Sequence, residues 1–234
     1  MLAGLIAPVR FVLFDFDGPI CHLFAGQPAK RVAQDMVKWL ERRGLGDLLT
    51  DTERAEPDPY TVLRAVDRRS PGSDLIDELE QWLTRKELDA VRTAFPTAHV
   101  DPLIRTWTAV GARLAVTTNN APGPVERYLA TRGLQECFAR HIYGRTRDLG
   151  LLKPDPHCLN RALRALGADP QRTLMIGDTP SDCEAARRAG VGFLGYARDD
   201  HKAEVLRKAG AKHLVGSLEP VRRAVHKAGI NKAR

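Results

Sequence analysis

The chain has 234 residues, 43% of them hydrophobic and 28% charged, so it can bury a sizeable core and has the composition of an ordinary soluble globular protein. No apolar run approaches the length of a membrane-spanning helix, and the first residues lack the basic segment of a secretory signal, which argues against membrane and secreted classes. Of the net charge of +7, residues 197–234 supply ten Lys and Arg against four Asp and Glu, and their apolar residues at helical and strand spacing indicate a solvated folded surface rather than a nucleic-acid arm.

The predicted elements begin with a short apolar strand at residues 10–15, followed by a long block of helices. The next comparable strand, ARLAVTT at residues 112–118, comes nearly a hundred residues later. The residues between them follow a helical spacing and contain no convincing strand. The four expected helices are 28–44, one that begins at Asp58-Pro59, 73–83, and one that a Thr84-x-x-Glu87 capping box starts and that reaches Phe95. The proline-bearing segment 94–102 is the expected return hinge.

After residue 118, strands and helices alternate. The expected helices are 124–132, 156–166, 182–189 (announced by a Ser181-x-x-Glu184 capping box) and 203–209, and the expected strands are 141–144, 173–177, 191–197 and 212–216. Apolar strands alternating with short helices indicate a parallel sheet covered on both faces. We therefore predict an α/β fold, a Rossmann-like doubly wound parallel sheet formed by residues 1–21 and 100–234, with an α-helical insert at residues 22–99.

Polar residues stand at the carboxyl ends of these strands, where ligands bind in open parallel sheets. Asp15 and Asp17 follow the first strand, and Thr117, Thr118, Asn119 and Asn120 follow the second. Lys153 precedes the helix at 156–166, and Asp178 and Asp182 follow the strand at 173–177. Three or four carboxylates, a hydroxyl and an ammonium are thus expected at one rim.

Such a cluster of acids repels itself unless a cation lies among them. All the candidate ligands are oxygen atoms, and carboxylates are hard donors, which favours Mg²⁺ over zinc or copper. With Mg²⁺ and Lys153 present, the rim can hold a phosphate dianion. The parts then match phosphoryl transfer: an oxygen nucleophile, a metal, a fixed positive side chain and backbone donors.

Four segments resemble, in order and spacing, the motifs of the haloacid dehalogenase superfamily. They are DFDGPI (15–20), LAVTTN (114–119), Lys153-Pro154 and GDTPSD (177–182). The helical insert directly after the first segment resembles the cap of subfamily I, and the layout is similar to that of phosphoglycolate phosphatases. Pro19 departs from the family pattern, which most often has threonine there, and puts the geometry of that loop in question.

The resemblance implies a role for each matching residue. Asp15 is expected to attack phosphorus and form an aspartyl-phosphate, while Asp17 protonates the leaving oxygen and then deprotonates the attacking water. Thr118 and Lys153 are expected to hold phosphate oxygens, with Phe16, Gly18 and Asn119 completing the substrate-binding set. The expected Mg²⁺ site consists of the Asp15 and Asp178 carboxylates and the Asp17 main-chain carbonyl, supported by Asp182.

We therefore expect a monomeric, cytoplasmic, Mg²⁺-dependent phosphatase that acts on a small phosphorylated metabolite, with phosphoglycolate as a reasonable substrate class. Four scattered cysteines without a Cys-x-x-Cys pair fit a reducing compartment. A sugar-phosphate phosphomutase shares every motif and stays open as an alternative. So does a binding or regulatory protein that keeps the fold without turnover. Neither nucleic-acid nor membrane partners are expected.

Overall fold

The core of the structure, a computed structural model that describes residues 2–230, is a six-stranded sheet in which all neighbouring strands are parallel. Its order is β5-β4-β1-β6-β7-β8, so the chain first builds to one side of β1 and then to the other. The strands are β1 (Phe11–Phe14), β4 (Arg113–Thr117), β5 (Ile142–Tyr143), β6 (Thr173–Gly177), β7 (Gly192–Tyr196) and β8 (Leu214–Val215). The predicted doubly wound α/β fold is confirmed, while residues 1 and 231–234 of the expected core segment lie outside the described residues.

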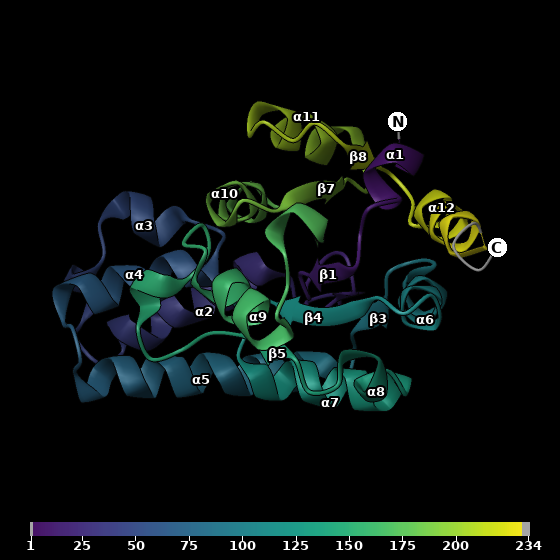
Figure 1. The fold of residues 1–234 in the computed structure, drawn as a ribbon. Helices are drawn as coiled ribbons and strands as arrows, with labels where there is room; N and C mark the ends of the chain where they lie inside the picture. The colour runs from purple at the N-terminus through teal and green to yellow at the C-terminus, as the bar shows by residue number, and fades with distance from the viewer. Residues whose placement is uncertain (1, 231–234) are drawn as a thin grey trace.

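Both faces of this sheet are buried, because successive side chains along a strand point to opposite sides. In β1, Val12 and Phe14 belong to one apolar cluster, and Leu13 belongs to another. The first cluster is covered by α1 (Leu2–Ile6), α6 (Val100–Ala109), α7 (Pro122–Arg132), α8 (Gln135–Phe138) and α12 (Glu219–Ile230). The second is covered by α9 (His157–Leu166) and α10 (Pro180–Ala189), and α11 (Asp200–Lys208) packs beside β7 (Figure 1).

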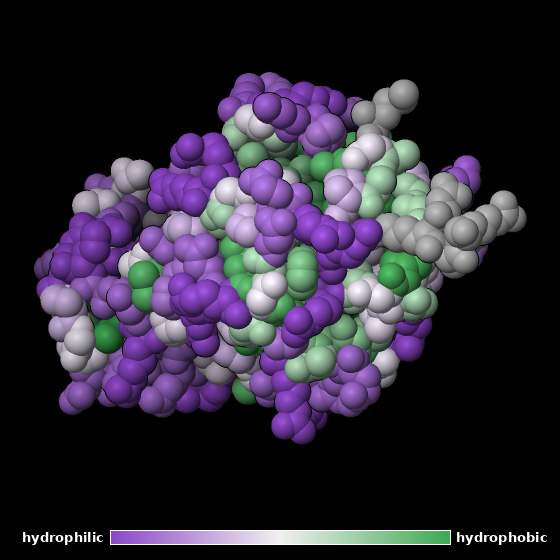
Figure 2. All heavy atoms as spheres, viewed as in Figure 1, coloured by the Kyte–Doolittle hydropathy of each residue, from purple (hydrophilic) through white to green (hydrophobic). Residues whose placement is uncertain are grey.

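The helices inserted between β1 and β4 gather at one end of the molecule (Figure 1). They are α2 (Ala29–Glu41), the 3₁₀ turn Gly46–Leu48, α3 (Asp51–Ala55), α4 (Pro59–Arg69) and α5 (Asp74–Val91). Their inward side chains form an apolar cluster of their own, with Met36, Leu63 and Leu79 fully buried. Their outer surface is mainly hydrophilic on the face seen in Figure 2. Leu149 and Leu152, from the loop after β5, complete this cluster.

Two short strands join the helical insert to the core, where the sequence predicted none. β2 (Cys21–His22) pairs antiparallel with β3 (Phe95–Pro96) as the chain leaves and re-enters the core. Two residues are too few for an alternating pattern to be visible in the sequence. Thr97, next to β3, donates its backbone N–H to Ile20 and its hydroxyl to the Gly18 carbonyl, at 3.1 and 2.5 Å. The return hinge is therefore bonded directly to the loop that follows β1.

One continuous helix, α5, replaces the two helices predicted at residues 73–83 and 84–95. No glycine or proline interrupts residues 74–91, so no residue in this range ends the helix. The Thr84-x-x-Glu87 pattern is therefore no capping box: both residues lie within the helix and point toward Arg145, as described below. The capping-box prediction here was wrong.

Helix α6 begins inside the predicted hinge at residues 94–102 and continues through residues 103–109, for which the sequence analysis predicted no element. Pro102 stands in its first turn, where a missing N–H costs no helical hydrogen bond. Val100, Leu103, Ile104 and Trp107 are buried at the spacing of one helical face. The proline that suggested a break thus marks a helix start. Among residues 2–230, no helix combines the length and apolar character needed to cross a membrane.

Candidate active site

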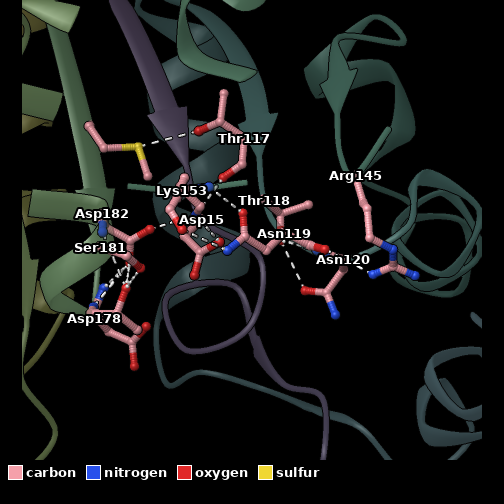
Figure 3. Close-up of polar contacts among 12 residues, drawn as sticks. Asp15, Thr117, Thr118, Asn119, Asn120, Arg145, Lys153, Asp178, Ser181 and Asp182 are labelled. Carbon is pink, nitrogen blue, oxygen red and sulfur yellow. Dashed lines mark hydrogen bonds and ion pairs between the residues drawn. The ribbon is translucent and has the colours of Figure 1, made fainter. Parts of the chain in front are cut away.

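The structure brings together the acids, the lysine and the threonine that the sequence predicted, at the carboxyl ends of β1, β4 and β6 (Figure 3). The chain changes winding direction at β1, and open α/β sheets bind ligands at such a point. Asp15, Thr118, Lys153 and Asp178 are all buried there, and Asp182 is fully buried. Four segments that are distant in the sequence therefore form one polar cluster.

Lys153 lies at the centre of this cluster. Its ammonium donates hydrogen bonds to Asp15 Oδ1 at 2.8 Å, Asp182 Oδ1 at 2.5 Å and the Thr117 carbonyl at 3.1 Å. Burial opposes the charge, but the Asp15 and Asp182 carboxylates outweigh it and hold the pKa of Lys153 above its ordinary value. The lysine is a permanent cation that fixes one oxygen of Asp15.

Asp182 caps the start of α10, a role that the sequence analysis assigned to other residues. The helix begins with a capping box of Thr179 and Asp182, not of Ser181 and Glu184. Asp182 Oδ2 accepts from the backbone N–H of Asp178 and Thr179, at 3.1 and 3.0 Å. Its other oxygen is left to Lys153. Asp182 therefore fixes the lysine and the Asp178 backbone together.

The loop after β1 brings Asp17 beside Asp178. Gly18 has a φ of +119°, and a β-carbon there would overlap the Asp178 carboxyl, so this position requires glycine. Asp17 Oδ1 accepts from the Leu23 backbone N–H at 2.9 Å. Burial, and secondly the charge of Asp15, raise the pKa of Asp17 to about 6, against the lowering effect of that hydrogen bond. Asp17 thus titrates nearer neutrality than an ordinary aspartate.

The acids fit a hard divalent cation. One carboxylate oxygen from each of Asp15, Asp178 and Asp182 lies within 4.8 Å of the others. Asp178 Oδ1 is buried without a hydrogen-bond partner, and Lys202 of α11 is paired with Oδ2. Burial, and after it the charge of Asp182, raise the pKa of Asp178 to about 6 despite Lys202. An unpaired buried oxygen among like charges is what a bound cation would satisfy.

The predicted substrate-binding residues have different surroundings. The Thr118 hydroxyl donates to Asn120 Oδ1 at 2.9 Å and lies at the rim. The Asn119 side chain accepts from the Lys153 backbone N–H at 2.8 Å and donates to the Lys153 carbonyl at 3.3 Å. The Phe16 ring is buried and packs edge-on against Tyr128, so only the Phe16 backbone can serve the site.

A cavity of about 490 Å³ lies between this rim and the inserted helices. The rim contributes Asp15, Asp17, Thr118 and Lys153 to its lining. The insert contributes Phe24, Ala29, Pro57, Asp58, Pro59, Tyr60 and Arg64. Arg64 of α4 also donates to the Lys153 carbonyl at 3.3 Å. A cationic side chain of the insert therefore faces the same space as the acids.

Sequence reasoning missed a second buried ion pair, that of Arg145 and Glu87. Arg145 follows β5, Glu87 lies in α5, and both side chains are fully buried. No motif announces Arg145. The available signal was the spacing of Glu80, Thr84 and Glu87 along one helical face. This spacing indicates a binding site for a cation only once a basic residue is known to lie opposite that face.

Comparison with known proteins identifies the family. A family model described as haloacid dehalogenase-like hydrolase matches residues 9–190. A phosphoglycolate phosphatase of Rhodospirillum rubrum is 30% identical over 205 residues, 81% of this chain and 82% of that protein. The pyrophosphatase PpaX of Halalkalibacterium halodurans is 31% identical over 204 residues, 81% of this chain and 85% of that protein.

Solved structures agree. A HAD family hydrolase from Deinococcus radiodurans R1, solved with bound phosphate and sodium, has a TM-score of 0.61 at 26% identity, covering 96% of this chain and 98% of that one. The expectation of an enzyme of the phosphatase type is confirmed by these relatives. The chain belongs to the haloacid dehalogenase-like hydrolase family.

Proposed function

We propose that the protein is a Mg²⁺-dependent phosphatase that hydrolyses a small phosphorylated metabolite through an aspartyl-phosphate on Asp15. The observation that carries the proposal is the buried Lys153 ammonium, bonded at once to Asp15 and Asp182 beneath the 490 Å³ cavity. This arrangement presents a carboxylate nucleophile and a fixed positive charge to the same cavity.

Asp15 supplies the nucleophile. Because Lys153 holds Oδ1, the carboxylate is fixed in orientation and Oδ2 is the oxygen that attacks phosphorus. As this oxygen–phosphorus bond forms, the bond between phosphorus and the leaving oxygen breaks. A carboxylate is a weak base, so water readily cleaves the resulting acyl phosphate in the second half of the reaction.

Asp17 moves the proton. It protonates the leaving oxygen in the first step and then accepts a proton from the water that attacks the acyl phosphate. The pKa of about 6, raised mainly by burial, lets the same carboxyl act in both directions near neutral pH. The Leu23 N–H holds its Oδ1, which leaves Oδ2 for the proton.

The phosphate itself is held by the chain around Lys153. We assign the Thr118 hydroxyl, the Lys153 ammonium and the backbone N–H groups of Phe16 and Asp17 to its oxygens, with Gly18 allowing the close turn. We assign Asn119 to holding the lysine, because its amide is engaged by the Lys153 backbone on both sides.

The Asp15 and Asp178 carboxylates and the Asp17 main-chain carbonyl would hold Mg²⁺, and Asp182 would support them. The unpaired Asp178 Oδ1 favours this assignment. When bound, the ion neutralises the acids and the developing phosphate charge. Lys202 pairs with the other oxygen of Asp178 and therefore competes with the ion for this carboxylate.

We propose a substrate that carries a second anionic group, of the phosphorylated carboxylic acid class to which phosphoglycolate belongs. Two relatives named phosphoglycolate phosphatase, at 30% and 27% identity, support this class. Arg64 lines the cavity, and its guanidinium can pair with a carboxylate. The cavity volume of about 490 Å³ limits the substrate to a small molecule.

The remaining expectations are proposals of the same kind. We propose that residues 22–99 act as a cap domain over the core of residues 1–21 and 100–234. We propose a monomer in the cytoplasm, a compartment that suits four cysteines without a disulfide among the described residues.

The test is phosphate release from a panel of phosphate compounds, with Mg²⁺ and with EDTA. The panel contains phosphoglycolate, pyrophosphate, sugar phosphates and para-nitrophenyl phosphate. We expect Mg²⁺-dependent release with the highest kcat/KM for phosphoglycolate. Arg64→Met should raise KM about tenfold for phosphoglycolate and leave it unchanged for para-nitrophenyl phosphate, which has no carboxylate. Isomerisation of a sugar phosphate without release would indicate a phosphomutase, and no reaction of any ester would refute the proposal.

A further inference from the structure

The Arg145–Glu87 pair joins α5 of the insert to the loops that follow β4 and β5 of the core. Arg145 Nη1 donates to Glu87 Oε1 at 2.9 Å, and Nη2 donates to Glu87 Oε2 at 3.2 Å. Its other three N–H groups reach Glu80, Thr84 and the Asn119 carbonyl, each at 2.9 Å. Every donor of the guanidinium is therefore bonded.

Glu87 is equally engaged on the other side. Its Oε1 also accepts from the Tyr60 hydroxyl of α4 at 3.0 Å and from the Asn120 amide at 3.1 Å. Its Oε2 accepts from the Ala121 backbone N–H at 3.1 Å. One carboxylate of the insert thus holds two consecutive residues of the loop that carries Thr118 and Asn119.

These bonds continue to the catalytic lysine. Arg145 holds the backbone of Asn119, and the Asn119 side chain holds the backbone of Lys153 through two hydrogen bonds. Gly144 and Asn120 come so close that a β-carbon on Gly144 would overlap the Asn120 carbonyl oxygen, so the two loops have no room to slide. A path of direct contacts therefore runs from α5 to the residue that orients Asp15.

The loop of residues 145–153 is also anchored in the insert by apolar side chains. Leu149 and Leu152 are buried in the cluster formed by α2, α4 and α5. Arg64 of α4 bonds to the Lys153 carbonyl. The loop belongs to the core by sequence, yet its packing partners belong to the insert. A displacement of the insert would therefore move Lys153.

Packing alone does not account for a buried ion pair at this place. Apolar side chains of similar volume often stabilise a fold as well as a buried pair does, because they avoid the cost of removing two charges from water. What apolar side chains do not provide is directional bonding to the backbone at Asn119 and Ala121. The pair is thus suited to fixing position.

We propose that Arg145 and Glu87 are positioning residues, through which the helical insert sets the place of Lys153 and of the Thr118–Asn119 loop. The inference rests on the proposed function, in which Lys153 fixes the nucleophile. Neither residue lines the 490 Å³ cavity, so their loss should lower kcat more than it raises KM. A misplacement of about 1 Å at a reacting group can cost about a hundredfold in rate.

The experiment measures kcat and KM with para-nitrophenyl phosphate, and thermal unfolding, for Glu87→Gln, Arg145→Met and the double variant. We expect each single variant to lose about ten- to a hundredfold in kcat with less than about a threefold change in KM. The matched control is the exposed pair Arg147 and Asp77, which joins the same loop to the same helix at 3.2 Å. Arg147→Met/Asp77→Asn should keep wild-type kcat.

The double variant separates positioning from stability. It leaves no buried charge unpaired, so it should unfold at a higher temperature than Arg145→Met, while its kcat stays low. Wild-type kcat in the double variant would overturn the inference, as would a change confined to KM. Where Arg145→Met fails to fold, Arg145→Lys keeps the charge but not the five-donor geometry, and a wild-type kcat there would overturn the inference equally.

The wild-type and control proteins distinguish the two proposals. Turnover in both, together with full turnover in the double variant, would reject the positioning role and leave the phosphatase proposal intact. An absence of turnover in the wild type would reject the phosphatase proposal and, with it, the role assigned here.

Discussion

The acids at the rim and the Arg145–Glu87 pair are both buried charged clusters, and they differ in how completely their polar atoms are paired. At the rim, three carboxylates lie within 4.8 Å, two lysines face them, and Asp178 Oδ1 has no partner. Around Arg145, every guanidinium donor and both oxygens of Glu87 are bonded. The first cluster is incomplete and the second is closed.

This difference indicates what each cluster is for. Burial raises the pKa of Asp15, Asp17 and Asp178, which means that the folded protein disfavours the charged form of these acids. Such a cluster has room for a cation and a phosphate. A closed cluster has room for neither and can only hold its neighbours in place. Chemistry is therefore expected at the rim and positioning at Arg145.

The largest effect is expected from the proposed nucleophile. Asp15→Asn removes the carboxylate to which we assign the attack and keeps the shape of the side chain, so turnover of phosphate esters should fall by more than about 10⁴-fold. The measurement is phosphate release under Mg²⁺ saturation, with thermal unfolding to show that the variant folds. Asp200→Asn, an exposed aspartate at the start of α11, is the matched control and should keep full activity. An active Asp15→Asn would contradict the assignment of the rim as the reacting cluster.

The rim could be predicted from the sequence because each of its parts follows a local pattern. Asp15, Lys153 and Asp178 come directly after a strand or before a helix, and parallel strands carry their carboxyl ends to one edge. The same argument predicted the sheet, which the structure and the family match confirm. Local patterns sufficed wherever the topology alone brings residues together.

The Arg145 cluster could not be predicted in this way. Its two charges lie 58 residues apart, in an irregular loop and near the C-terminal end of a helix, and neither position has a sequence signature. Thr84 and Glu87 matched a capping box by spacing, although their hydrogen bonds run across to Arg145. The two-residue strands β2 and β3 were missed for a related reason, since they exist only through their partner.

The next effect concerns the metal and its competition with protons. Without Mg²⁺, the raised pKa values of Asp15 and Asp178, about 7 and about 6, mean that these two proposed ligand carboxylates bind protons more tightly in the folded state than in the unfolded state. Their contribution to stability is full below about pH 4 and is lost as the pH rises through 6 and 7. We expect Mg²⁺ to replace these protons, so its stabilisation should be small at pH 5 and larger at pH 8.

Thermal unfolding with and without Mg²⁺ at these two pH values measures this difference. At a Mg²⁺ concentration of a hundred times Kd, the gain is about 2.7 kcal/mol, or roughly 5–10 °C for a chain of this size. Asp178→Asn is the matched variant and should show no Mg²⁺-dependent shift at either pH. An equal shift at pH 5 and pH 8 would mean that the ion binds away from the rim acids.

The smallest effect tests whether Lys202 partly neutralises the acids at the rim in the absence of a metal ion. Lys202 is about one-quarter exposed and pairs with Asp178, so it competes with Mg²⁺ for the same carboxylate. Lys202→Met should therefore tighten Mg²⁺ binding by about two- to fivefold, the range for a partly exposed ion pair, as measured by titration calorimetry. Lys208→Met, on the same helix and paired only with the exposed Glu204, should leave the Mg²⁺ Kd unchanged. Weaker binding in Lys202→Met would mean that the lysine orients Asp178 for the ion rather than competing with it, and the rim would then be more nearly complete than its unpaired oxygen suggests.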